Sequence, residues 1–103
     1  MAFKIKNKLN KDHIVAFLRA NKTDLRRKFG VTKIALFGSY ARDEQKTTSD
    51  IDLLIDMKVH DFNKRLDLRD YLEAQFQCKV DIGYFSSVRK YIMRLIEEDL
   101  IYA

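Results

Sequence analysis

Two aspartates, Asp50 and Asp52, open an otherwise apolar stretch, residues 50–57, with the sequence DIDLLIDM. If this stretch is a strand, alternate side chains share a face, which places both carboxylates on one face about 6.6 Å apart at the backbone. Like charges held this close favour protonation of one group, a conflict that a divalent cation removes. Magnesium is the usual cation where carboxylate oxygens share it with substrate phosphates. A bare Asp-x-Asp is more often a solvent-exposed strand face, and Asp56, near the end of the same face, takes that interpretation.

Gly38 and Ser39 directly follow a second apolar stretch, residues 31–37. Glycine lets the backbone approach a bulky anion, and a serine hydroxyl with adjacent amides can bind phosphate at a helix start. The turn is neither a Walker loop nor a dinucleotide-binding fingerprint. Asp81 lies inside a third apolar stretch, residues 80–85. Three acids on neighbouring strands, opposite a phosphate-binding turn, suit a two-metal phosphoryl or nucleotidyl transfer with the metals about 3.5–4 Å apart.

A small sheet must hold these residues, with strands expected at residues 31–37, 50–57 and 80–85. Helices are expected from an N-cap at Asp12 to Gly30 with an interruption at residues 21–23, at residues 40–45, at residues 61–77, and from Ser86 or Ser87 to Ile96. The apolar stripes of the last two helices are expected in the core: Phe62, Leu66, Leu72 and Phe76, then Val88, Ile92, Leu95 and Ile96. This order predicts an α/β (α+β) fold, a small mixed sheet with helices mainly on one face.

The bulk properties favour one domain, residues 1–103, with anionic partners. The length allows a single core, and the formal net charge is +5. Such a charge suits nucleotides, nucleic acid or an acidic protein face. Each basic cluster, including the run at residues 26–28, is nevertheless more often a solvated surface.

The sequence also favours a cytoplasmic protein without a membrane segment. No stretch approaches the roughly 18 apolar residues of a membrane span. The basic residues 1–10 are not followed by the long apolar run of a secretory signal. Cys78 is the only cysteine, so no intrachain disulfide can form.

Three segments together resemble the signature of the DNA polymerase β-like nucleotidyltransferase superfamily, most closely its minimal nucleotidyltransferase (MNT) group. They are ALFGSYAR at residues 35–42, SDIDLLI at residues 49–55 and KVDI at residues 79–82. The resemblance covers nearly the whole chain and implies the minimal nucleotidyltransferase fold. One departure is Asp43, where a glycine commonly follows the arginine; this alters the loop but no metal ligand.

The resemblance implies metal-binding roles for the three aspartates. Asp50 and Asp52 would bind both of two Mg²⁺ ions. Asp81 would bind the catalytic ion and help to deprotonate the acceptor hydroxyl.

The resemblance also implies a nucleotide site. Gly38 and Ser39 would hold the β- and γ-phosphates of ATP, and Arg42 would either neutralise phosphate charge or form a surface ion pair. The reaction would be in-line attack on the α-phosphorus with loss of pyrophosphate.

The implied partner is a HEPN-domain toxin. Proteins of the MNT group typically act as antitoxins that transfer AMP to a tyrosine hydroxyl of a HEPN ribonuclease and so neutralise it. Two alternatives stay open: a non-catalytic antitoxin that sequesters its partner, and a nucleotidyltransferase that acts on RNA ends. Homo-oligomerisation also stays open.

Overall fold

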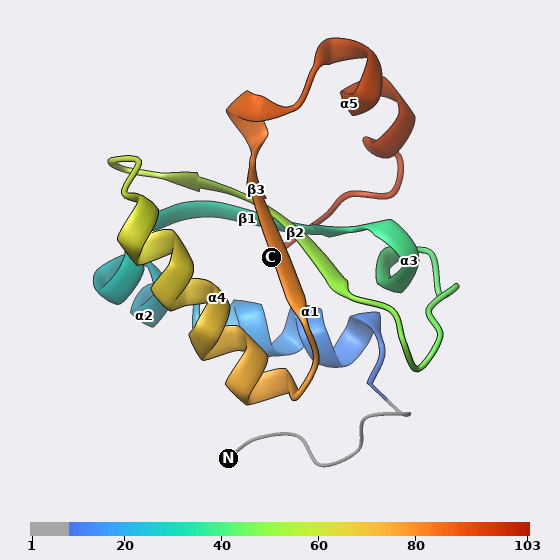
Figure 1. Cartoon of the computed structure of the whole chain (residues 1–103), viewed down its shortest axis with the longest axis horizontal. Coiled ribbons are helices and arrows are strands. Elements are labelled where there is room, and N and C mark those ends of the chain that lie inside the picture. Colours follow the sequence, from blue (N-terminus) through green and yellow to red (C-terminus); the bar gives the residue numbers. More distant parts are fainter. Residues whose placement is uncertain (1–8) are drawn as a thin grey trace.

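The computed structural model describes residues 9–103 and places them in one α/β domain (Figure 1). The elements, in chain order, are α1 (Lys11–Ala20), α2 (Lys22–Phe29), β1 (Val31–Phe37), α3 (Gly38–Ala41), β2 (Ile51–Met57), α4 (Phe62–Phe76), β3 (Val80–Tyr84), the 3₁₀ turn η2 (Phe85–Ser87), α5 (Lys90–Ile96) and β4 (Ile101–Tyr102). The expectation of no secretory signal rested on the basic residues 1–10. Residues 1–8 of this stretch lie outside the described residues. Among residues 9–103, no helix has the length and apolar character needed to cross a bilayer.

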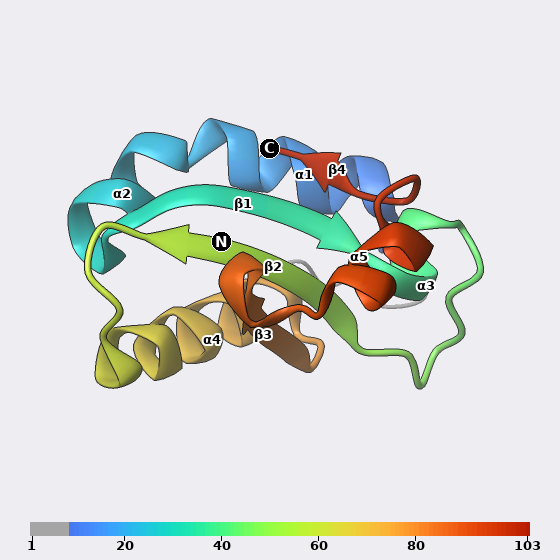
Figure 2. The ribbon, with the colours of Figure 1, turned by 90° about the horizontal axis from the view of Figure 1, so that it is seen from above.

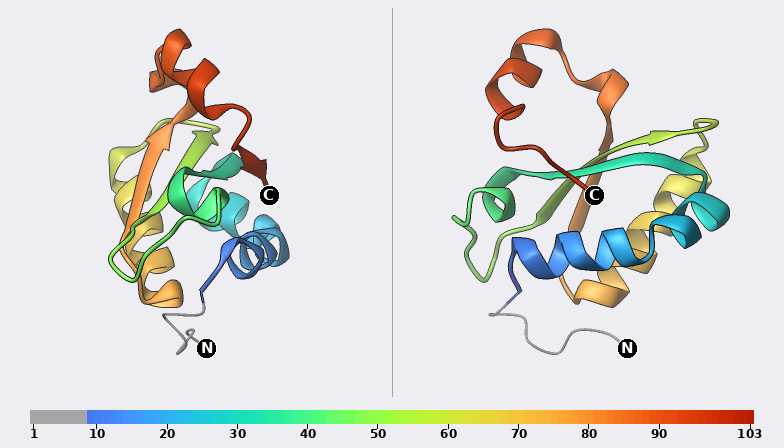
Figure 3. Two further views of the ribbon diagram at one scale, coloured as in Figure 1. Left: turned by 90° about the vertical axis from the view of Figure 1, so that its right-hand side faces the viewer. Right: turned by 180° about the vertical axis from the view of Figure 1, so that it is seen from behind.

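The sheet has four strands in the order β3-β2-β1-β4 and is mixed. β2 runs antiparallel to β1 and parallel to β3, and β4 pairs antiparallel with β1 at the edge. Helices α1, α2 and α4 lie on one side of the sheet, while η2 and α5 stand on the other side (Figures 1 and 3). The predicted fold class, a small mixed sheet with helices mainly on one face, is therefore confirmed.

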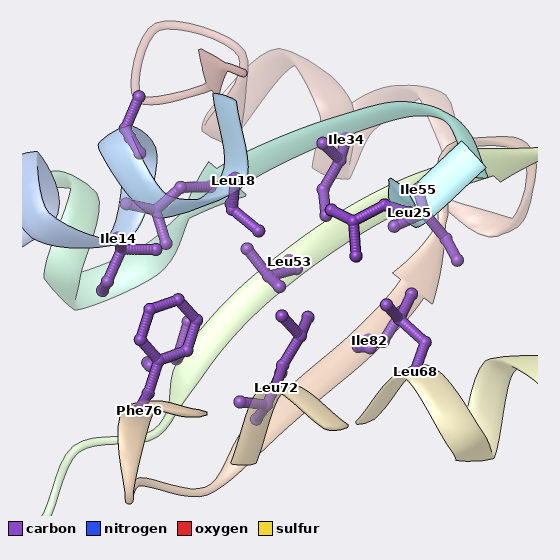
Figure 4. Packing of buried hydrophobic residues seen from close by; sticks show 14 of the residues in the cluster. Ile14, Leu18, Leu25, Ile34, Leu53, Ile55, Leu68, Leu72, Phe76 and Ile82 are labelled. Atoms are coloured by element: carbon purple, nitrogen blue, oxygen red, sulfur yellow. The ribbon is translucent and has the colours of Figure 1, made fainter. Parts of the chain in front are cut away.

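The core lies between the sheet and the three helices on its covered face. Alternation along β2 sends Ile51, Leu53 and Ile55 into it, each 0% exposed. Figure 4 shows Leu53 lying between side chains of α1 and α4. On the opposite face of β2, Leu54 pairs with Ala35 and Gly83 and is also buried. The intervening Asp52 therefore sits on the face without the main helices, where the alternation predicted it.

The helix boundaries differ from the sequence-based expectation mainly at their starts. The side chain of Asn10, rather than Asp12, caps α1 by accepting a hydrogen bond from the His13 backbone N–H at 3.0 Å. Asp61 caps α4 as predicted. Residues 86 and 87 lie in the 3₁₀ turn, so they do not cap α5, which begins at Lys90.

Two expected core stripes are partly wrong. Phe62 is 62% exposed, and Leu68 takes the buried position next to Leu72 and Phe76 in α4. In α5 none of the seven residues is buried, and Leu95 is 73% exposed. Helical spacing shows that a helix has an apolar face, but it does not show whether that face meets the rest of the domain.

Candidate active site

Asp52 and Asp81 lie side by side on neighbouring parallel strands. Asp52 of β2 is in register with Asp81 of β3, and the preceding pair, Ile51 and Val80, is buried in the core. Because side chains alternate along a strand, both carboxylates point to the open face. Asp50 directly precedes β2 and is exposed. The predicted meeting of two acids from distant parts of the chain is thus present in the strand register.

The charges of the three aspartates act on one another. Burial is the largest cause that raises the pKa of Asp52 above its ordinary value, and the negative charges of Asp81 and Asp50 raise it further. The positive charge of Arg42 opposes this shift. The protein therefore collects negative charge around a half-buried carboxyl group, which is the situation that a divalent cation relieves.

The three carboxylates are suitable ligands for Mg²⁺, although their side chains do not converge on a single position. Carboxylate oxygens are the ligands that Mg²⁺ prefers. Within residues 9–103, no three side chains of His, Cys, Asp or Glu are close enough to hold a metal as they stand. Asp50 and Asp81 are both exposed, so their side chains can rotate toward Asp52 without disturbing the core.

Gly38 brings the start of α3 against the carboxylate of Asp52. Its φ of 76° is in the left-handed region that favours glycine, and a Cβ at this position would collide with Asp52 Oδ2. The residue before the helix, Phe37, is extended and pairs with Asp52 across β1 and β2, and no side chain caps the start of the helix. The start of α3 therefore lies against the Asp52 carboxylate, and phosphate binding by the Gly38 and Ser39 amides stays a prediction.

Arg42 lies at the end of α3 and forms ion pairs. Its Nε lies 3.0 Å from Glu44 Oε1, and its Nη1 lies 3.6 Å from Asp99 Oδ2. These acids, Glu44 first, raise the pKa of Arg42. Of the two roles expected for Arg42, the ion pair is the one present, and its charge still reaches Asp52. The role in phosphate binding stays a prediction.

The backbone conformation of Asp43 explains why related sequences commonly have a glycine at this position. Its φ is 57°, in the left-handed region where glycine is the least strained residue and aspartate is one of the few others tolerated. Its carboxylate lies 3.0 Å from Lys11 Nζ, which ties the loop to α1. The turn after α3 is therefore formed without the glycine.

A hollow of about 200 Å³ beside Asp50 contains residues that sequence reasoning left unassigned. The Tyr40 hydroxyl lies 3.8 Å from Cys78 Sγ, which donates to the Ser49 carbonyl oxygen at 3.4 Å. Burial raises the pKa of Tyr40 to about 12 and also raises the pKa of Cys78, so both groups are neutral at pH 7. These contacts fix the loop that leads into Asp50. No sequence signal could have paired two residues 38 positions apart.

Comparisons with known proteins agree with this architecture. A family model described as a nucleotidyltransferase domain matches residues 18–103. The protein adenylyltransferase MntA of Thermococcus cleftensis is 37% identical over 95 residues, which are 91% of this chain and 96% of that protein. A solved minimal nucleotidyltransferase superposes with a TM-score of 0.75 at 23% identity, over 91% of this chain and 96% of its own.

A second solved structure, a toxin–antitoxin crystal structure with AMP-PNP, aligns over 82% of this chain and 64% of that chain. Its TM-score is 0.57 and the identity is 28%. The matched residues include every predicted site residue, from Gly38 to Asp81. The chain belongs to the nucleotidyltransferase domain family.

Proposed function

We propose that this protein transfers AMP from ATP to a tyrosine hydroxyl of a HEPN-domain toxin and thereby neutralises it. The observation that carries the proposal is the register of Asp52 with Asp81, together with the backbone of Gly38 packed against Asp52. Support also comes from the adenylyltransferase name of a relative and from the structural neighbour that is a toxin–antitoxin with AMP-PNP.

The chain's own groups have separate tasks in this reaction. The amides at the start of α3 hold the β- and γ-phosphates and orient the α-phosphorus toward the acceptor. The acceptor oxygen forms a bond to the α-phosphorus while the bond from that phosphorus to the bridging oxygen breaks, so pyrophosphate leaves. Asp81, which is exposed on the open face, receives the hydroxyl proton. Asp50, Asp52 and Asp81 would hold Mg²⁺, which supplies charge neutralisation for the acids and the triphosphate.

A protein acceptor is favoured by α5. This helix stands on the open side of the sheet with Tyr91 59% exposed and Leu95 73% exposed, and Asp99 behind it is paired to Arg42 of α3 (Figure 3). Exposed apolar side chains close to the site suit contact with a protein surface better than contact with water. The same feature would serve an antitoxin that acts by sequestration alone, so the test must separate binding from transfer.

The test is transfer of label from α-³²P-ATP in the presence of Mg²⁺. The protein is incubated with the product of a neighbouring HEPN-type gene, or with RNA. We expect label on the toxin. Label on RNA alone would instead establish transfer to RNA ends, and loss of toxin activity without label would establish sequestration.

A matched pair of variants identifies the acids. Asp52→Asn should abolish labelling, whereas Asp56→Asn, four residues along the same face of β2, should leave it unchanged because Asp56 is in register with Lys33 at the other end of the strand. Equal loss in both variants would contradict the assignment of Asp52. Circular dichroism of both variants checks that the fold is kept.

A further inference from the structure

A continuous basic groove lies at the end of the domain opposite α3. Three adjoining hollows of about 240, 320 and 330 Å³ are formed by α2, the start of β1 and the connection between β2 and α4. Arg26 lines all three, and Lys58 lines two of them, so the hollows form one feature. Figure 2 shows α2 and the connection to α4 at one end of the molecule and α3 at the other. We call this feature the basic groove; its cations are Lys22, Arg26, Arg27, Lys33, Lys58 and Lys64.

The basic groove concentrates positive charge. Six of the chain's 20 basic residues line it, against one of its 15 acidic residues, Asp61. Arg27 is paired with Asp24 at 2.7 Å. Within residues 9–103, none of the other five cations of the groove has an acidic partner at salt-bridge distance. Charges of one sign in a hollow focus the field and attract a polyanion.

Helix stabilisation does not account for these cations. Cations stabilise the C-terminus of a helix and are unfavourable at its N-terminus. Arg26 and Arg27 are in the last turn of α2, where that effect applies. Lys22, however, is the first residue of α2. Lys64 lies in the first turn of α4, and that turn contains no acidic residue. Their positions cost helix stability, so an external anion is the better explanation for them.

An aromatic pair, of which Tyr102 is exposed and Phe85 is partly buried, continues the basic groove at Lys33. The Nζ of Lys33 lies 4.5 Å from the ring centroid of Phe85 and 5.2 Å from that of Tyr102. The two rings are nearly parallel, with centroids 5.9 Å apart, and Tyr102 is 46% exposed. A row of cations that ends at an exposed aromatic ring offers contacts to phosphates and to an unpaired base together.

We propose that the basic groove binds the phosphodiester backbone of a single-stranded nucleic acid, with one base stacked on Tyr102. The groove is distinct from the site of the aspartates. It surrounds the first residues of β1, and Gly38 follows the last one, which puts about 20 Å of strand between them. Binding there therefore needs neither ATP nor the three acids.

The test is fluorescence anisotropy with a fluorescein-labelled 12-nucleotide RNA and the matching DNA, without ATP or Mg²⁺. We expect binding that weakens as the salt concentration rises, with a log–log slope of about −0.7 for each phosphate contact. Tighter binding of RNA would identify RNA as the ligand, and equal binding would identify single-stranded nucleic acid in general. Absence of binding at 50 mM salt would overturn the proposal.

Charge-matched variants locate the site. Arg26→Glu with Lys58→Glu should weaken binding at least tenfold. Lys90→Glu with Arg94→Glu on α5 changes the net charge equally at exposed positions outside the groove and should weaken it much less. Equal losses in the two double variants would show non-specific attraction and refute the groove.

Two further arms separate the ligand classes. Tyr102→Leu should weaken binding of the oligonucleotides at least fivefold while leaving the salt slope unchanged, because it removes stacking without removing a cation. If polyglutamate competes as effectively as single strands do, the ligand is an acidic protein face and the proposal is refuted. If duplex competes as effectively, the ligand is a duplex and the proposal is again refuted. Asp52→Asn should bind as the unmodified protein does, so this test can fail or succeed independently of AMP transfer.

Discussion

Two glycines with nearly the same positive φ allow the contact between α3 and the Asp52 carboxylate to be tested. Gly30 has a φ of 73° and Gly38 a φ of 76°. A Cβ added to Gly30 would meet nothing within 4 Å, whereas one added to Gly38 would collide with Asp52 Oδ2 and lie 3.0 Å from Asp52 Cγ. Gly30→Ala therefore reports the strain of a positive φ alone, whereas Gly38→Ala combines such strain with displacement of the carboxylate.

The strain alone has an expected size. A left-handed conformation costs a residue with a Cβ about 1–2 kcal/mol. For a domain of this size each kcal/mol lowers the midpoint of thermal unfolding by about 4–8 °C. Gly30→Ala should show this loss and keep full AMP transfer. Gly38→Ala should lose more stability than Gly30→Ala and should lose AMP transfer, because the carboxylate must leave its place against α3.

A double-mutant cycle separates the collision from the strain. In the Asp52→Ala background the carboxylate is gone and only the contact with the Cβ of residue 52, at 3.2 Å, remains, so Gly38→Ala should cost less stability than it does in the unmodified protein. Thermal unfolding followed by circular dichroism gives the free energies, and transfer of labelled AMP gives the activity. If Gly38→Ala transfers AMP as well as Gly30→Ala does, or if its cost in stability is as large without the Asp52 carboxylate as with it, then α3 does not hold that carboxylate in the active site.

Three further predictions follow from the charges of the site. Asp52→Asn should stabilise the metal-free protein by up to about 1 kcal/mol at pH 7, the scale of a like-charged cross-strand pair. The folded protein raises the pKa of Asp52, so ionisation costs stability as pH rises through that pKa, and the difference in unfolding midpoint should disappear at lower pH, where both states protonate the group. Mg²⁺ should raise the unfolding midpoint of the unmodified protein but not that of Asp81→Asn, and a chelator should reverse the rise; equal shifts in both would exclude Asp81 as a ligand. Arg42→Ala should change stability little, because its ion pairs are exposed to solvent. An increase in KM for ATP in that variant would establish a role in phosphate binding, and an unchanged KM would limit Arg42 to its ion pairs.

The side of the sheet on which the acids lie could be predicted from the sequence, because strand alternation has a period of two. Burial of Ile51 and Leu53 leaves Asp52 only the opposite face, and the same rule applied to Val80 and Ile82 places Asp81 beside it. The register that joins the two strands is a tertiary property, and here the resemblance to a family supplied what periodicity could not.

The features that the sequence did not predict all depend on contacts between distant parts of the chain. The apolar spacing of α5 predicted burial, but Leu95 is 73% exposed. The pairing of Arg42 with Asp99 joins residues 57 positions apart, and no local pattern marks it. β4 has two residues and no periodicity, and it forms because the edge of β1 accepts it, with the Ala103 amide donating to the Ile34 carbonyl oxygen at 3.0 Å. Contacts between distant segments are decided by the whole fold.

The separation of the basic groove from the aspartates gives the molecule a permanent electric dipole. Its longest extent is 34 Å, and the cations of the groove and the three aspartates lie near opposite ends of β1. Such a particle turns in the field of any charged surface before it touches that surface. On a heparin support the protein should bind through the basic groove and expose the three carboxylates to the buffer. On an amine-bearing support the orientation should be the opposite. The charge of the support therefore decides which end of the protein a soluble reagent can reach.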